Sequence, residues 1–204
     1  MSTTLDNRVL EKAENLFLRY GIKSVSMDDI ARELGISKKT LYKTIENKKN
    51  LLMQVMNAHI QAELEEMVKI RTEAKDAIDE MLRVTQYVIP TLRKMTPTLI
   101  YDMQKYYQEA WNLMETYHNE HIYQEIKSNI ERGIKEGVYR DDIDPDIIAK
   151  LYVGKSILII DESLFPLKDY NKENLFKEYI KYHVRGIAST KGLKLFEKHF
   201  KKLI

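Results

Sequence analysis

The stretch SMDDIARELGISKKTLYKTIENKKNLL, residues 26–52, decides the fold of the N-terminal part of this chain. It contains two short segments with apolar residues at helical spacing, separated by Gly35 and followed by a cluster of lysines. Ser26 is a typical N-cap with Asp29 three residues later, as in a capping box, and Ser37 is a second N-cap. Two capped helices joined at a glycine predict a helix-turn-helix unit, in which the second helix enters the major groove of DNA.

The outward side of the second helix carries lysines and hydroxyl groups. Lysine ammonium groups suit phosphates as point charges, and hydroxyl groups can reach phosphates or base edges. Lys48, at the start of the next helix, is expected to hold a phosphate together with the backbone N–H groups there. A capped helix pair with a solvated lysine face also occurs in helical proteins that bind no DNA, and the pattern alone leaves that alternative open. The residues predicted to contact DNA are Ser26, Met27, Ser37, Lys38, Lys39, Thr40, Tyr42, Lys43, Thr44 and Lys48.

The rest of the sequence predicts an all-α protein of about nine or ten helices. The chain has 204 residues, of which 44% are hydrophobic, and only seven glycines and four prolines. Its Leu, Ile, Met, Glu and Lys residues recur at spacings of three and four. We expect a helix-turn-helix domain over residues 1–50 and a helical bundle over residues 51–204. Beyond a helix that starts at Asn47, helices are predicted at residues 74–94, 97–106, 108–136, 145–163, 172–188 and 191–203.

Composition narrows the class of protein further. The absence of cysteine excludes disulfides and thiolate metal sites, and permits a reducing compartment. The N-terminal residues lack the apolar core of a signal peptide, and no segment is long and apolar enough to cross a membrane, so we expect a soluble cytoplasmic protein. The net charge is only +2, but residues 1–57 hold ten Lys and Arg against seven Asp and Glu. The positive charge therefore lies at the end that contains the helix-turn-helix pattern.

Residues 8–56 resemble the N-terminal domain of the TetR family of bacterial transcriptional regulators. The resemblance lies in LFLRYGIKSVSMDDIA, at the end of the first helix, and in ARELGISKKTLYKTIENKKNLL. Two positions depart from the family pattern, because Ile45 replaces the usual phenylalanine and Lys39 stands where a small residue, often glycine, is common. Ile45 still suits a core position, whereas Lys39 can alter base preference. The pattern is matched at Gly21, Ser26, Ile30, Ala31, Gly35, Ile36, Ser37, Leu41, Tyr42, Lys48 and Leu51.

The resemblance implies a homodimeric, ligand-responsive repressor that binds palindromic double-stranded DNA and has no catalytic residues, no cofactor and no bound metal. It also implies a C-terminal bundle that dimerises through its last long helices. The sequence supports this independently, because adjacent apolar pairs recur every four residues in the segment 172–188 and form a stripe wider than one neighbour needs. Gly154 and Gly186 offer points of close approach. The residues predicted for the dimer interface are Ile157, Ile160, Phe176, Tyr179, Ile180, His183 and Ile187.

A pocket for an unknown small molecule is expected in the C-terminal bundle by the same resemblance. Aromatic residues of the middle helices could line it with flat walls and hydroxyl groups, although aromatic residues at helical spacing usually belong to an ordinary core. The candidate lining residues are Tyr87, Tyr101, Tyr107, Trp111, Met114 and Tyr152.

Two other classes of function remain open from the residues alone. His118, His121 and Glu125 lie at helical spacing and could be written as the metal ligands of a helical enzyme, although no other motif marks a catalytic site. The last segment, KGLKLFEKHFKKLI, carries Leu193, Phe196, Phe200 and Leu203 on one side and five lysines elsewhere. It could lie on a membrane surface, but we expect it to pack on the bundle with its lysines in water.

Overall fold

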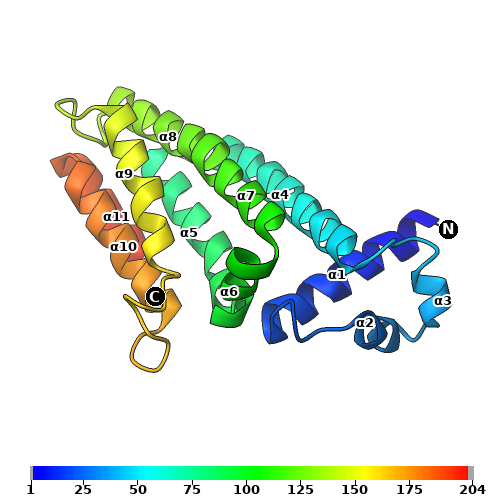
Figure 1. The fold of residues 1–204 in the computed structure, drawn as a ribbon. Helices are drawn as coiled ribbons and strands as arrows, with labels where there is room; N and C mark the ends of the chain where they lie inside the picture. The colour runs from blue at the N-terminus through cyan, green and yellow to red at the C-terminus, as the bar shows by residue number, and fades with distance from the viewer. Residues whose placement is uncertain (1, 202–204) are drawn as a thin grey trace. The chain divides into compact units, whose positions relative to one another are not determined.

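The structure describes the backbone of residues 2–201 and the side chains of residues 7–201. In this computed structural model the secondary structure is helical, which confirms the all-α prediction (Figure 1). Within the described chain, the single strand-like pairing is an antiparallel bridge between Tyr139 and Ala188. The helices are α1 (Ser2–Tyr20), α2 (Met27–Leu34), α3 (Lys38–Leu41), α4 (Lys48–Glu73), α5 (Ala77–Lys94), α6 (Pro97–Tyr106), α7 (Gln108–Tyr117), the π-helical turn η1 (His118–Ile122), α8 (Tyr123–Lys135), α9 (Pro145–Leu158), α10 (Lys172–Ile187) and α11 (Thr190–Phe200).

The helix predicted over residues 108–136 is interrupted in the structure. α7 ends at Tyr117, and η1 separates it from α8. The N–H of Tyr123 donates to the carbonyl oxygen of His118, five residues earlier, which is the hydrogen bond of a π-helical turn. Apolar spacing does not reveal such a turn, because one extra residue rotates the buried stripe without ending the helical pattern.

Capping residues fix where two later helices begin. α6 and α9 start at Pro97 and Pro145, as expected for proline in a first turn. Asp144 caps α9 by accepting hydrogen bonds from the N–H groups of Asp146 and Ile147, at 2.8 and 3.2 Å. Thr96, at the N-cap position of α6, makes no such side-chain hydrogen bond. α9 is also shorter than predicted, because the chain leaves it through turns that carry i to i+3 hydrogen bonds. The predicted end of the last helix lies outside the described residues.

The chain divides into two compact units. The first unit runs up to Leu64 and includes Lys94–Glu115, so it contains α1, α2, α3, α4 up to Leu64, α6 and most of α7. The second unit comprises Glu65–Arg93 and the chain from Thr116 onward. The domain boundary predicted at residue 50 lies near the start of α4 and stays a prediction.

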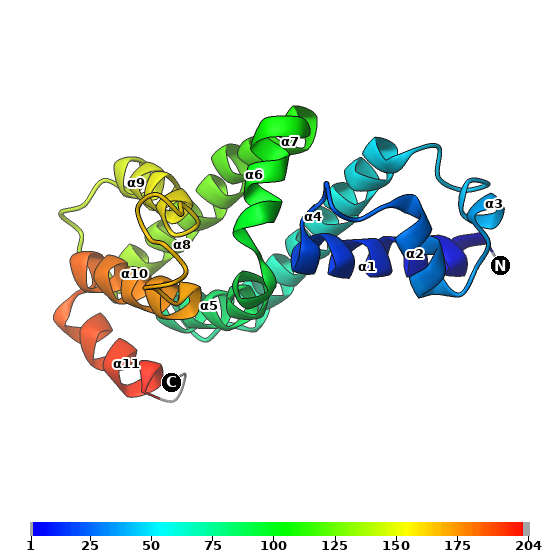
Figure 2. The ribbon, with the colours of Figure 1, turned by 60° about the horizontal axis from the view of Figure 1, so that its bottom comes forward.

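The second unit is built around one hydrophobic core that α5, α8, α9, α10 and α11 share (Figure 2). Ile130 and Ile180 are fully buried in it, and Phe196 and Phe200 bring α11 onto the same cluster. The last helix therefore packs on the bundle, as its sequence predicted, while Leu203 lies outside the described residues. Among the described helices, none is long and apolar enough to cross a membrane.

Candidate nucleic-acid interface

α2 begins at a complete capping box. The N–H of Asp29 donates to Oγ of Ser26 at 3.1 Å, and the N–H of Ser26 donates to Oδ2 of Asp29 at 2.9 Å. The Ser26 hydroxyl also donates to Asp29 Oδ2, at 2.6 Å. These hydrogen bonds from Ser26 hold the pKa of Asp29 below its ordinary value, because they stabilise the charged carboxylate. The Ser26 hydroxyl, predicted to contact DNA, is thus already used to start the helix.

The turn between α2 and α3 depends on Gly35. Its backbone is left-handed, with φ 67° and ψ 29°, a conformation that costs other residues free energy. The N–H of Ile36 donates to the carbonyl oxygen of Ala31 at 3.0 Å and closes the end of α2. Ile30 and Leu41 are fully buried between the two helices. The helix pair is therefore held by contacts between residues close together in sequence.

α3 is a single helical turn that starts at Ser37. The N–H of Thr40 donates to Oγ of Ser37 at 3.1 Å, and the two hydroxyl groups share a hydrogen bond of 2.8 Å. The Thr44 hydroxyl donates to the carbonyl oxygen of Leu41 at 3.2 Å. All three hydroxyl groups, which we predicted to contact DNA, thus order α3 and the turn that follows it.

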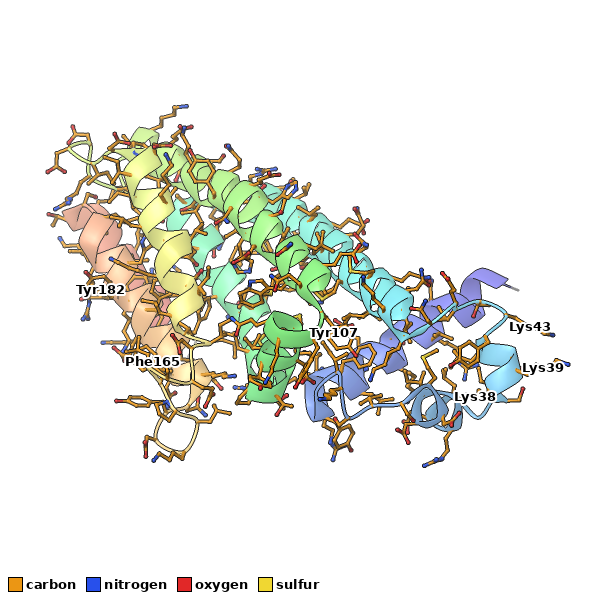
Figure 3. The ribbon with its side chains drawn as sticks, viewed as in Figure 1. Lys38, Lys39, Lys43, Tyr107, Phe165 and Tyr182 are labelled. Atoms are coloured by element: carbon orange, nitrogen blue, oxygen red, sulfur yellow. The ribbon has the colours of Figure 1, made fainter. Side chains whose placement is uncertain are left out.

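Three exposed side chains remain on this surface: Lys39, Tyr42 and Lys43. No hydrogen bond or ion pair of theirs is found within the described part of the chain. Figure 3 shows that Lys39 and Lys43 extend away from α3. Lys38 differs, because its Nζ lies 2.9 and 3.1 Å from the carboxylate oxygens of Asp28, and this hydrogen bond raises the pKa of Lys38.

Met27 and Lys48 are placed differently from their prediction. Met27 is buried, so it belongs to the core of the helix pair and not to a DNA-contacting surface. Lys48 is half-buried, and its ammonium group donates to the carbonyl oxygen of Lys23 at 3.3 Å. Burial lowers the pKa of Lys48, although the negative charges of Asp102 and Asp29 oppose that shift. The role of Lys48 at a phosphate stays a prediction.

Sequence analysis missed Asp102, which ties α6 to the loop after α1. Its Oδ2 accepts a hydrogen bond of 2.7 Å from the N–H of Lys23, and the residue is 2% exposed. Gly21 permits this approach, because a Cβ at that position would lie 2.7 Å from Cγ2 of Thr98. The signal for this contact in the sequence is Asp102 itself, an acidic residue at a buried position of a helix stripe that is otherwise apolar.

Known proteins share both the helix pair and the larger fold. Residues 9–55 match the model of the family described as bacterial regulatory proteins, tetR family. The HTH-type transcriptional regulator YhgD of Bacillus subtilis strain 168 is 28% identical over 202 residues, which cover 93% of this chain and 100% of YhgD. The regulator YvaF of the same strain is 26% identical over 167 residues, 80% of this chain and 85% of YvaF. Residues 9–55 therefore form a DNA-binding domain of the TetR type.

These matches confirm the resemblance seen in the sequence and support a DNA-binding transcriptional regulator. A solved structure of a transcriptional regulator from Saccharomonospora viridis in complex with choline has the same fold, with a TM-score of 0.71. It is 23% identical, and the alignment covers 92% of this chain and 99% of that one. The likeness therefore extends beyond α1–α3 into the second unit.

The residues predicted to line a ligand pocket are spread over both units. Tyr101, Tyr107, Trp111 and Met114 belong to the first unit, and Tyr87 and Tyr152 to the second. Trp111 and Tyr152 are buried, whereas Tyr101 is exposed, with the Lys105 ammonium group 5.0 Å from its ring centre. The pocket stays a prediction, and Tyr101 is the candidate whose exposure suits an interior wall least.

The predicted dimer residues differ in how deeply they are buried. Three are half-buried: Ile157, Ile160 and Tyr179. Four are buried inside the subunit itself: Phe176, Ile180, His183 and Ile187. The ring of His183 packs 4.8 Å from that of Tyr152, and burial, with a smaller effect of Lys155, lowers its pKa to about 4. We therefore remove these four residues from the proposed dimer face, because they already cover the subunit's own core.

The histidine group proposed as metal ligands is not assembled as a site. Glu125 instead faces Arg71, whose Nη1 donates to both of its carboxylate oxygens at 3.2 Å. His118 is half-buried and His121 is exposed. In the described chain, no three or more His, Asp or Glu side chains are grouped so that they could hold a metal ion.

Proposed function

We propose that this regulator is a ligand-responsive homodimeric repressor of a palindromic operator. In each subunit α3 enters the major groove of one half-site, and the half-sites lie about one helical turn, or a multiple of it, apart. A small molecule bound in the second unit favours a dimer whose two α3 helices are wrongly spaced, and its effect is limited by its difference in affinity for the two states.

The observation that carries the homodimer is an exposed apolar stripe on α9. Ile147, Leu151 and Leu158 are 55, 49 and 43% exposed, and with Gly154 they recur on one side of the helix. Burying apolar surface stabilises an interface by roughly 25 cal/mol per Å². A second copy of this stripe is the partner that matches it in shape and chemistry, because a two-fold interface uses the same patch on both subunits.

α10 places an exposed aromatic residue, Tyr182, beside this stripe. α9 and α10 lie side by side (Figures 1 and 2), and the Tyr179 hydroxyl joins them by donating to the carbonyl oxygen of Tyr152 at 2.6 Å. Tyr182 is 67% exposed on the outer side of α10 (Figure 3), and the Lys155 ammonium group lies 4.9 Å from its ring centre. Two adjacent helices per subunit would build a four-helix bundle across the two-fold axis.

Two glycines support the same face. A Cβ added at Gly154 or at Gly186 would meet nothing within 4 Å, so the subunit itself does not require glycine at either position. Glycine inside a helix costs about 1 kcal/mol relative to alanine. Close approach of a helix from a second subunit is a physical reason for that cost.

A charge in the stripe tests the homodimer. Leu151→Glu places a carboxylate in the proposed interface, and Val68→Glu is the matched control, because Val68 on α4 is 52% exposed outside the stripe. We expect sedimentation to give a dimer for the wild type and Val68→Glu, and a monomer for Leu151→Glu. The monomer should also lose tight operator binding, since only one half-site contact remains. A dimeric Leu151→Glu protein contradicts this interface.

The ligand-responsive part of the proposal rests on the fold shared with the regulator solved with choline. His118, in η1, has a buried Nδ1 without a hydrogen-bond partner among the described residues, and burial lowers its pKa, which favours a neutral ring. Irregular helical turns of this kind are frequent at functional sites. Choline is therefore the first probe, and we expect it to release the bound operator. Unchanged DNA binding at millimolar choline contradicts this ligand.

We also infer that the protein works as a regulator without catalysis and acts on DNA in the cytoplasm. The match to a family of bacterial regulatory proteins is the support for this inference. The test is occupancy of the DNA upstream of its own coding region in intact cells, compared with a Tyr42→Ala variant.

A further inference from the structure

We propose that Lys39 reads a guanine in each half-site of the operator and so sets base preference. The inference rests on the proposed function, in which α3 enters the major groove, and it goes further by assigning one base to one side chain.

Only some side chains of the predicted DNA-contacting surface are free to contact DNA. Ten residues of this surface were candidates, but the hydroxyl groups of Ser26, Ser37, Thr40 and Thr44 are engaged in caps and turns. Met27 is buried, and the Lys48 ammonium group donates to a backbone carbonyl. Lys38 is paired with Asp28. The exposed side chains that are left are Lys39, Tyr42 and Lys43.

Lys39 and Lys43 differ in their position relative to α3. In a recognition helix the N-terminal residues contact base edges, while residues farther along approach the backbone. Lys39 is the second residue of α3, whereas Lys43 lies in the turn after the helix has ended at Leu41. Figure 3 shows that both side chains extend away from α3. Lys39 is therefore placed for a base and Lys43 for a phosphate.

The ammonium group of Lys39 limits which base edges it can contact. An ammonium group donates hydrogen bonds and accepts none, so it selects base edges that offer acceptors. In the major groove guanine presents two adjacent acceptors, O6 and N7, whereas adenine pairs its N7 acceptor with the N6 amino donor. An ammonium group facing adenine therefore meets a like donor. Guanine is the base that satisfies Lys39 best.

Asp28 supports the assignment of the base contact to Lys39, because it forms an ion pair with the neighbouring lysine, Lys38. Lys38 adjoins Lys39 in the sequence and is also exposed, but its Nζ contacts the Asp28 carboxylate at 2.9 Å. The negative charge beside Lys38 also repels a phosphate approaching that position. Of the two adjacent lysines, Lys39 is therefore the one left free to select a base.

The experiment is selection of bound sequences from a random double-stranded DNA library at fixed salt, using the full chain and its variants. We expect the wild type to select a palindrome with one guanine at the equivalent position of each half-site. Lys39→Ala should lose that guanine only, with discrimination at that position falling about 5- to 150-fold, the equivalent of 1–3 kcal/mol. Lys39→Gln should change the selected base from guanine to adenine, because glutamine matches the adenine edge.

Lys43→Ala is the matched control, since it removes an exposed lysine of the same surface. It should weaken binding to all sequences alike, leave the selected palindrome unchanged, and lower the salt dependence by about one phosphate contact. Lys39→Arg should retain the guanine and serves where Lys39→Ala binds too weakly to select. An unchanged palindrome for both Lys39→Ala and Lys39→Gln overturns the assignment. Failure of the wild type to select any sequence counts instead against the proposed function.

Discussion

The helix pairs α2–α3 and α9–α10 use their side chains in opposite ways. In the first pair, polar groups such as the Ser26 and Ser37 side chains are engaged in caps, and the unpaired residues are Lys39, Tyr42 and Lys43. In the second pair, the exposed stripe on α9 is apolar or glycine. The first pair is complete within its unit and offers charge to a polyanion, whereas the second gains stability only when another surface covers it.

The largest difference should come from the same substitution made in each pair. Leu41→Ala removes a fully buried side chain and should lower the free energy of unfolding of the first unit by about 2–5 kcal/mol. Leu151→Ala removes a side chain that is half in solvent, so subunit stability should stay within about 0.5 kcal/mol. Urea unfolding at low protein concentration measures both. Equal losses of unfolding free energy in Leu41→Ala and Leu151→Ala would contradict the proposed difference between the two helix pairs.

Glycine substitutions should act with opposite signs in the two pairs. Gly35→Ala forces alanine into the left-handed backbone of the turn and should destabilise the first unit by about 1–2 kcal/mol. Gly154→Ala should stabilise an isolated subunit by up to about 1 kcal/mol, because alanine favours the helix and its Cβ meets nothing. The same change should weaken dimerisation, so its melting temperature should rise in dilute protein and fall in concentrated protein. A rise at both concentrations argues against a helix approaching Gly154.

The sequence was most informative where structure depends on near neighbours. Caps at Ser26 and Ser37 and the left-handed turn at Gly35 involve residues within a few positions of one another, so their chemistry could be read directly. The cap of α9 at Asp144 likewise bonds residues two and three positions away. Residue roles on the DNA-facing surface were harder, because the sequence shows that a hydroxyl is present but not whether a cap has already engaged it.

Long-range geometry could not be predicted in the same way. The apolar pairs of α10 show that two sides are apolar but not which side meets the subunit's own core, so Ile180 and His183 were assigned to the wrong neighbour. The hydrogen bond from Lys23 to Asp102 joins residues 79 positions apart, and the local pattern around Asp102 does not show which residue is its partner. The π-helical turn at His118–Ile122 was missed because it preserves helical spacing on both sides.

Removing a cap tests how strongly the first pair depends on local bonds. Ser26→Ala should destabilise the first unit by about 1 kcal/mol, because two N-terminal hydrogen bonds of α2 are lost. In the wild type Asp29 has a lowered pKa, so its stabilising effect is present above its ordinary pKa and is lost as pH falls through the lowered value. Urea unfolding between pH 3 and pH 6 should therefore show a steeper loss for the wild type than for Ser26→Ala. If stability falls equally with pH in both proteins, the pH dependence does not come from the Ser26–Asp29 hydrogen bonds.

The smallest expected effect concerns a contact that joins α1 to α4 within the first unit. Nδ1 of His59 lies 2.7 Å from Oε1 of Glu14, and Nε2 lies 3.7 Å from Glu63, so the hydrogen bond and both charges raise the pKa of His59. A raised folded-state pKa stabilises the fold below the ordinary value of about 6.5, and this contribution is lost as pH rises through the raised value. His59 is partly in solvent, so we expect a loss of less than about 1 kcal/mol between pH 6 and pH 8.5. His59→Gln should remove that pH dependence, whereas Lys12→Gln, which breaks a more exposed ion pair to Glu33, should keep it. If the pH dependence of stability persists in His59→Gln, a group other than His59 causes it.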